Sequence, residues 1–281
     1  MNKLTEPRWL FFTDLDGTLL DHDTYDFSPA LPALTALRVA RVPLILCSSK
    51  THAEMKYWSG MLNIDYPFIS ENGGALSIPK GCFTKPFDFH EERNAHLLIL
   101  LGTSYPTLRA ALVEIAQQTY LPLVGFGDMN SEQIAALTGL SLEQANLAKM
   151  RDADEPFFID RDFNEGEVRR LEATVASRGL RLTRGGRFFH LTGENDKGKA
   201  VQLLTKLYRD EWQQAIRTVG FGDSLNDLPL LHAVETPILV RNKNGEVDAN
   251  VLAQIQARIT TEAGPAGWNE AVLKILETLY S

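Results

Sequence analysis

Cysteine is scarce in this chain, and long apolar runs are missing. The only two cysteines among 281 residues, Cys47 and Cys82, are too few for a disulfide-stabilised scaffold. No stretch approaches the roughly 18 consecutive apolar residues that a membrane-spanning helix needs. The first residues, MNKLTEPRWLFF, lack the basic region, apolar stretch and cleavage site of a secretory signal. We therefore expect a cytoplasmic protein with no membrane partner.

An excess of basic residues is also missing. Lysine and arginine total 28 against 36 aspartates and glutamates, which gives a formal net charge of -8. General nucleic-acid binding depends on many Lys and Arg contacts with phosphates, so this composition argues against such a partner. A local basic pocket for one small anion stays compatible with the charge. Hydrophobic residues make up 44 % of the chain, which is enough for a substantial core.

What the chain does have is an alternation of strand-like and helical segments. Short apolar runs typical of buried strands are followed by helical patterns that open with capping residues. Such strand–helix–strand alternation predicts an α/β fold with a Rossmann-like, doubly wound parallel sheet. The expected elements are strands over 9–13, 43–47, 66–69, 216–221 and 237–240, and helices that begin near residues 28, 51, 197 and 227.

The alternation breaks down in the middle of the chain. Residues 75–78 and 82–84 are expected to form a hairpin, and the helices and strands that follow do not alternate regularly. The simplest organisation is a sheet domain interrupted by an inserted α+β module. The predicted domains are a core of residues 1–84 and 192–281 and an insert of residues 85–191.

Carboxylates follow two of the predicted strands at the point where each strand ends. Asp14 and Asp16 come directly after the first strand, and Asp223 and Asp227 follow the strand over 216–221. Ligands bind beyond the carboxyl ends of strands in open parallel sheets, so we expect these side chains to meet in one crevice. Several carboxylates there would raise each other's pKa, and a hard dication removes that penalty. The sequence therefore predicts a Mg²⁺ site.

A lysine and hydroxyl groups complete this set of polar residues. Ser48-Ser49-Lys50 follow the second predicted strand, and Lys197 opens a helix whose N-terminus also favours an anion. Acids, a dication, hydroxyls and a lysine together suit phosphoryl transfer, in which catalysis is mostly positioning and charge stabilisation. The segment 193–200, GENDKGKA, also approaches a nucleotide-binding P-loop, but Ala200 has no hydroxyl for Mg²⁺. A nucleoside triphosphatase is therefore disfavoured.

These motifs, taken in order, resemble those of the haloacid dehalogenase superfamily. DLDGT at 14–18, the strand that ends in Ser48, Lys197 and GDSLND at 222–227 stand in the order of that family. The resemblance implies that Asp14 attacks phosphorus as a nucleophile and that Asp16 acts as general acid and then general base. The further contacts that it implies are phosphate binding by Ser48, Ser49, Lys197 and Asn226, and Mg²⁺ binding by Asp14, the Asp16 backbone carbonyl, Asp223 and Asp227.

A closer resemblance extends beyond these motifs. The stretches ILCSSKTHAEM, ISENGG, LTGLSLEQANLAKMRDADEPF and LTRGGRFFHLTGENDKGKAV are similar to mannosyl-3-phosphoglycerate phosphatases. This likeness implies a C2B-type cap and hydrolysis of mannosyl-3-phosphoglycerate, or its glucosyl analogue, to mannosylglycerate and phosphate. The likeness also makes Lys50 a candidate substrate contact, since it stands where many relatives with such caps carry arginine. The loop Arg184-Gly185-Gly186-Arg187 is another candidate, because arginines that flank glycines suit a carboxylate or phosphate.

Several of these residues have structural alternatives when taken alone. Asp227 is typical of a first helical turn, where an acid favours the helix dipole. The charge run of Arg151, Asp154 and Glu155 is typical of a solvated face, and His190 is typical of a structural histidine on an apolar strand.

Functional alternatives also stay open. The same core serves other sugar-phosphate phosphatases, such as the sucrose-phosphate type, and phosphomutases. A non-catalytic binding protein on this fold is a third possibility, although its expected mark would be a lost nucleophile or metal acid. Neither the sugar nor the oligomeric state follows from the sequence.

Overall fold

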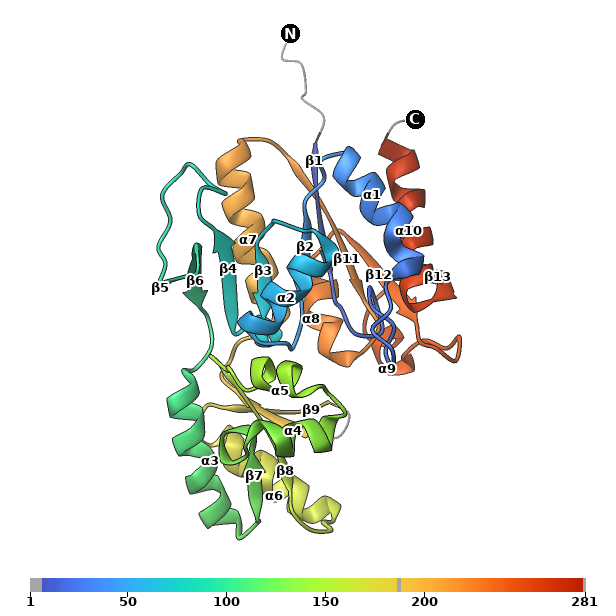
Figure 1. Ribbon diagram of the computed structural model, residues 1–281. Coiled ribbons are helices and arrows are strands. Elements are labelled where there is room, and N and C mark those ends of the chain that lie inside the picture. The colour runs from blue at the N-terminus through green and yellow to red at the C-terminus, as the bar shows by residue number, and fades with distance from the viewer. Residues whose placement is uncertain (1–6, 186–187, 280–281) are drawn as a thin grey trace.

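The computed structural model describes residues 7–185 and 188–279 and contains two sheets (Figure 1). The strands of the larger sheet are β1 (Arg8–Thr13), β2 (Leu44–Cys47), β3 (Phe68–Ser70), β4 (Ala75–Pro79), β5 (Glu91–Arg93), β6 (His96–Leu100), β11 (Ile216–Gly222), β12 (Thr236–Arg241) and β13 (Arg258–Ala263). Their order is β13-β12-β11-β1-β2-β3-β4-β6-β5. The pairs from β13 to β3 are parallel, and the pairs that join β3, β4, β6 and β5 are antiparallel.

Helices cover both faces of this sheet and give it two apolar cores. In β1, Phe11 packs on one face and Leu10 and Phe12 pack on the other, which is why this strand reads as a continuous apolar run. The predicted doubly wound core is confirmed. One face carries η1 (Ser28–Ala30), α1 (Leu31–Val39), α2 (His52–Leu62) and α10 (Gly264–Leu279), and the other carries α7 (Lys197–Trp212), α8 (Leu228–His232) and α9 (Ala249–Leu252).

The smaller sheet is antiparallel, with strands in the order β7-β8-β10-β9, and also separates two apolar clusters. Its strands are β7 (Leu123–Gly125), β8 (Asp154–Ile159), β9 (Arg181–Gly185) and β10 (Phe188–Thr192). One face carries α3 (Tyr105–Thr119) and α6 (Glu165–Ala176), and the other carries η3 (Phe126–Asp128), α4 (Ser131–Thr138) and α5 (Leu142–Ala148). Because α5 also contacts α2, this second face is turned toward the larger sheet (Figure 1).

The segment 91–100 pairs differently from the sequence-based expectation. The predicted hairpin of residues 75–78 with 82–84 is wrong, because β4 pairs along its whole length with β6, from Ala75–Leu100 to Pro79–His96. β5 and β6 thus extend the larger sheet instead of opening the insert. We therefore propose to move the domain boundaries from 85 and 191 to near 101 and 192, and we call residues 101–192 the cap and the remainder the core.

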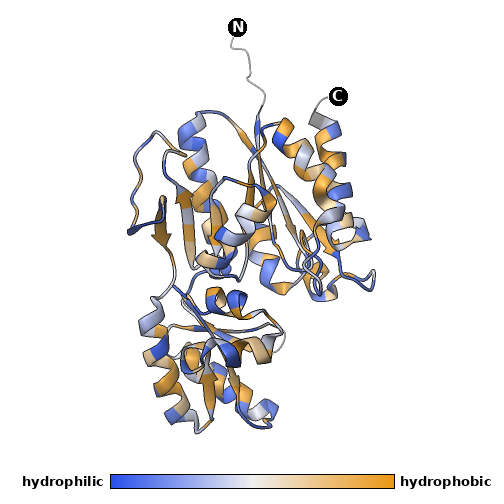
Figure 2. Cartoon of the chain, viewed as in Figure 1, coloured by the Kyte–Doolittle hydropathy of each residue, from blue (hydrophilic) through white to orange (hydrophobic). Residues whose placement is uncertain are grey.

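Burial and helix caps follow the sequence patterns in most places. Figure 2 shows apolar residues concentrated on the strands of both sheets, with polar residues along the outer turns of the helices. Thr51 caps α2 in a reciprocal capping box with Glu54, which agrees with the helix start predicted there. Among the described residues, no helix combines the length and the apolar character required to cross a bilayer.

Candidate active site

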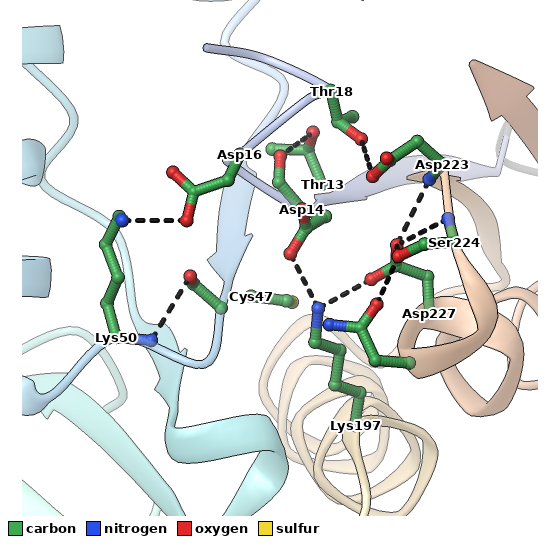
Figure 3. A network of polar contacts seen from close by, with 12 residues as sticks. Thr13, Asp14, Asp16, Thr18, Cys47, Lys50, Lys197, Asp223, Ser224 and Asp227 are labelled. Atoms are coloured by element: carbon green, nitrogen blue, oxygen red, sulfur yellow. Dashed lines mark hydrogen bonds and ion pairs between the residues drawn. The ribbon is translucent and has the colours of Figure 1, made fainter. Parts of the chain in front are cut away.

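The site lies at the carboxyl ends of β1 and β11, where the parallel register brings distant segments together. Asp14 follows β1 directly, and its amide donates to the Phe221 carbonyl on β11 (3.0 Å). The next residues of that strand lead into Asp223 and Asp227. Figure 3 shows the Asp14 and Asp227 carboxylates at the end of the Lys197 side chain, with Asp223 beyond them next to Thr18, although 183 positions separate Asp14 from Lys197.

Lys197 is the cation of this cluster. It is the first residue of α7, whose N-cap is Asp196, and its ammonium donates to Asp14 Oδ1 (2.6 Å) and Asp227 Oδ1 (2.5 Å). The side chain is fully buried. Burial alone would lower the pKa of Lys197, but the Asp14 and Asp227 carboxylates together raise it. The ammonium is therefore a permanent positive charge beside Asp14.

The three acids around Lys197 form a cluster suited to a divalent cation. Asp14, Asp223 and Asp227 each offer a carboxylate oxygen, and these atoms lie within 4.8 Å of one another. Burial and the neighbouring Asp227 carboxylate raise the pKa of Asp14 well above its usual range and that of Asp223 to about 7. One lysine thus leaves negative charge uncompensated, and a bound dication would relieve it.

Backbone amides and a hydroxyl fix the orientation of the two acids that follow β11. Asp227 Oδ2 accepts from the amides of Asp223 (3.1 Å) and Ser224 (3.2 Å), so its other oxygen is left to Lys197. Thr18 Oγ1 donates to Asp223 Oδ1 (3.1 Å) across the site. Asp227 is the last residue of the short turn η4 (Leu225–Asp227) and the N-cap of α8, but its side chain is buried and makes no capping bond to that helix. The role of a simple helix-turn acid therefore does not account for it.

Asp16 points away from this cluster. Its carboxylate pairs with Lys50 Nζ (2.7 Å), and Figure 3 shows the two side chains on the far side of Asp14 from Asp223. The Asp16 side chain is 29 % exposed, compared with 7 % for Asp14. Asp14 thus has the Asp223 carboxylate on one side and the partly exposed Asp16 carboxylate on the other.

The loop after β2, residues 48–51, borders the same site, and we call it the 48–51 loop. Ser48 is buried, and its hydroxyl accepts from the Lys50 amide (3.3 Å). Lys50 Nζ also lies 4.9 Å from the centre of the Tyr25 ring, a cation–π distance. A small pocket beside Lys50 joins core and cap and is lined by Tyr25, Lys50, Glu54, Tyr57, Trp58, Leu140, Gln144 and Leu147.

The described contacts of two predicted ligand residues, Asn226 and Arg184, are with groups other than the clustered acids and Lys197. Asn226 is exposed and accepts from the Ser224 hydroxyl (2.6 Å), whereas the described partners of Lys197 are carboxylates. The Arg184 guanidinium lies over the rings of Phe163 (5.9 Å) and Phe189 (5.4 Å). Both rings belong to the apolar cluster beneath α3 and α6, opposite the cap face that contacts the core.

The rest of the predicted substrate loop is only partly visible. Gly185 ends β9 and pairs with Phe188, while Gly186 and Arg187 lie outside the described residues. The structure therefore does not bring Arg184 to the acids, and substrate contacts from this loop stay a prediction.

The charge run at 151–155, expected on a solvated face, is instead buried, so that expectation is wrong. The side chains of Asp154 and Glu155 are fully buried, and that of Arg151 is 7 % exposed. The expected structural role of His190 agrees with its contact to Asp154 (2.8 Å). Glu71, in ISENGG, accepts from cap backbone amides that follow Arg151, so a core carboxylate holds this cap segment.

Comparison with known proteins places this geometry in a family. The sequence profile of haloacid dehalogenase-like hydrolases matches residues 11–258. A glucosyl-3-phosphoglycerate/mannosyl-3-phosphoglycerate phosphatase from Methanococcoides burtonii is 42 % identical over 268 residues, which cover 95 % of this chain and 97 % of that protein. A phosphatase of the same description from Persephonella marina is 38 % identical and covers 96 % and 98 %.

Solved structures agree at the level of the fold. Protein 0175 of Thermoplasma acidophilum superposes with a TM-score of 0.67 at 19 % identity and covers 97 % of this chain and 99 % of that one. A sugar phosphatase of haloacid dehalogenase subclass IIB gives a TM-score of 0.64 at 17 % identity, with 95 % and 98 % covered. Because these alignments include the smaller sheet, the likeness extends over both core and cap.

Proposed function

The chain belongs to the haloacid dehalogenase-like hydrolases, and we propose that it hydrolyses mannosyl-3-phosphoglycerate, or the glucosyl analogue, to the glycosylglycerate and phosphate. The observation that carries the chemistry is the convergence of Asp14, Lys197 and the acids after β11. The substrate class rests on the two relatives, whose similarity runs through the cap as well as the core. A cytoplasmic location stays a prediction.

In the proposed reaction, Asp14 is the nucleophile. Its carboxylate attacks phosphorus, the ester P–O bond breaks, and the departing glycerate oxygen takes a proton from Asp16. A water molecule then attacks the phosphorus of the Asp14 acyl phosphate while Asp16 accepts a proton from it. Inorganic phosphate leaves and the Asp14 carboxylate is restored. The position of Asp16 beside Asp14, turned from the acid cluster, supports its role in proton transfer.

The remaining residues have positioning roles in this proposal. Lys197 offsets the charge of Asp14 and of the phosphoryl oxygens, which lets two anions approach each other. The Ser48 and Ser49 groups of the 48–51 loop bind phosphate oxygens. Lys50 is close enough to Asp16 to reach a carboxylate next to the leaving oxygen, as a phosphoglycerate ester provides.

The acid cluster fits Mg²⁺, which family members of this kind use. Asp14, Asp223 and Asp227, with the Asp16 backbone carbonyl, would hold the ion. Mg²⁺ prefers oxygen donors such as closely spaced carboxylates, and one lysine neutralises only part of the negative charge of these acids. When bound, Mg²⁺ stabilises the negative charge that develops on the phosphoryl oxygens.

Stability in the absence of metal is expected to fall as the pH rises from about 4 to about 7. The pKa of Asp223 is raised from its ordinary value to about 7 in the folded chain, so the folded state binds more protons than the unfolded state across this range. Mg²⁺ competes with those protons, so it is expected to raise the Tm more at about pH 8 than at about pH 5.

Differential scanning calorimetry with and without MgCl₂ at both pH values measures this effect. The Asp223→Asn variant is expected to lose most of it. Asp160→Asn, which changes an exposed cap carboxylate, is expected to keep it. An equal Mg²⁺ shift at both pH values, or a full shift in the Asp223 variant, would contradict the metal site.

A phosphate-release panel tests the substrate. We expect the highest kcat/KM with mannosyl- or glucosyl-3-phosphoglycerate in Mg²⁺, and much lower values with sucrose-6-phosphate and simple hexose phosphates. Higher activity on a hexose phosphate would favour a different sugar phosphatase. A rearranged phosphate ester without free phosphate would indicate a mutase, and no turnover on any ester would favour a binding protein.

A further inference from the structure

Several hydrogen bonds join the 48–51 loop to the core, and two of them reach the carbonyl groups on either side of Ser49. The Asn72 amide donates to the Ser48 carbonyl (3.0 Å), and the Glu71 amide donates to the Lys50 carbonyl (3.0 Å). Both donors belong to η2 (Glu71–Gly73), the turn that follows β3. The carbonyl of Ser49 lies between these two groups, so a hydrogen bond to it would fix the centre of the loop.

That partner comes from the cap. Arg151 Nη1 donates to the Ser49 carbonyl (3.0 Å). A second cap contact holds the end of the loop, where Thr51 Oγ1 donates to the Leu147 carbonyl of α5 (2.9 Å). The two contacts are independent of the catalytic acids. The conformation of the 48–51 loop thus depends on the cap as well as on the core.

Arg151 is rigidly placed for this contact. Its Nε donates to the Ala148 carbonyl (2.8 Å), and its guanidinium lies 3.5 Å from the Asp154 carboxylate. Both partners belong to the cap, so the cap fixes the position of the guanidinium. Burial alone would lower the pKa of Arg151, but the Asp154, Glu54 and Glu71 carboxylates together raise it. The buried charge is therefore retained and paired, and its geometry is costly to change.

We propose that Arg151 is a positioning residue of the phosphatase reaction, which holds the 48–51 loop in its working conformation through the Ser49 carbonyl. The inference rests on the proposed function, because it assigns phosphate contacts to this loop. Two catalytic features move with the loop: the Ser48 hydroxyl, and the Lys50 ammonium that pairs with Asp16 (2.7 Å). Displacing the loop by about 1 Å can cost roughly 100-fold in rate.

The test compares Arg151→Met, Arg151→Lys and Arg109→Met. Arg109 is a matched control, since it is another largely buried cap arginine whose partners, Asp128 and Glu155, are both in the cap. Asp154 keeps His190 as a partner when Arg151 is replaced. Kinetics with mannosyl-3-phosphoglycerate and with p-nitrophenyl phosphate, melting temperatures, and deuterium uptake by peptides that cover residues 48–51 are measured for each variant.

We expect Arg151→Met to lower kcat by about 100-fold on both substrates with a smaller change in KM, and to speed deuterium uptake in the 48–51 loop. Arg151→Lys, which keeps a donor for Ser49, is expected to recover most of kcat. Arg109→Met is expected to lower the melting temperature while kcat and loop uptake stay near wild type.

Equal kcat losses in Arg151→Met and Arg109→Met, or unchanged loop uptake in Arg151→Met, would overturn the inference and leave Arg151 a structural residue. A loss of kcat confined to mannosyl-3-phosphoglycerate would also overturn the inference, since Arg151 would then bind the glycerate or sugar of the substrate. If the wild type hydrolyses no ester, the proposed function fails instead, and deuterium uptake still decides whether Arg151 holds the loop.

Discussion

Asp14→Asn is expected to abolish turnover while the chain stays folded. The substitution keeps the shape of the side chain but replaces an anionic nucleophile with a neutral amide, so kcat is expected to fall by roughly 10⁴-fold or more. In the absence of metal the melting temperature is expected to hold or rise, because burial and the neighbouring Asp227 carboxylate raise the pKa of Asp14, and the neutral amide removes the charge that both disfavour. Phosphate release and calorimetry measure the two effects.

Asp160→Asn serves again as the control for loss of one carboxylate, since Asp160 is exposed on the cap. Its turnover is expected to match wild type. Near-normal phosphate release from Asp14→Asn would remove Asp14 as the nucleophile. Loss of activity together with loss of folding would instead assign Asp14 a structural role.

Lys197→Met is expected to cause the second large loss. It leaves Asp14 and Asp227 buried without their shared cation, and breaking a buried ion pair from one side costs about 3–5 kcal/mol. The positive charge that offsets the phosphoryl oxygens is lost as well, so kcat is expected to drop by about 10³-fold. Metal is expected to restore part of the stability, because Mg²⁺ neutralises the same carboxylates.

Lys199→Met is the matched control, two positions away in the same helix and exposed. It also tests the P-loop alternative, in which Lys199 would be the phosphate-binding lysine. We expect its stability and kcat to stay near wild type. The reverse pattern, with Lys199→Met inactive and Lys197→Met active, would contradict the assignment of the site.

The acid cluster was predictable because it depends on β-strand order alone. β1 and β11 are buried on both faces and so appear as apolar runs, and the carboxyl ends of neighbouring parallel strands must lie on one edge. Asp14 and Asp223 therefore meet once the two strands pair in parallel. Individual ion pairs within the site, such as that between Lys50 and the Asp16 carboxylate, could not be predicted from the sequence.

Features that depend on competing long-range partners were predicted poorly. β4 has two neighbours along the chain that could pair with it, and the longer apolar segment 96–100 takes the place expected for 82–84. The charges of Arg151, Asp154 and Glu155 look solvated in the sequence, because the groups that pair with them come from other segments. Local patterns carry no information about such contacts between segments that are distant in the sequence.

Trapping the acyl phosphate tests the central claim most directly. In Asp16→Asn, p-nitrophenyl phosphate can still transfer its phosphoryl group, because p-nitrophenolate leaves without a proton, but the water step lacks its base. Rapid quenching, borohydride reduction and mass spectrometry of the peptides are expected to find homoserine at position 14, with one equivalent of p-nitrophenol released. A burst of p-nitrophenol without modification of Asp14, or reduction at Asp223 or Asp227 instead, would contradict the account.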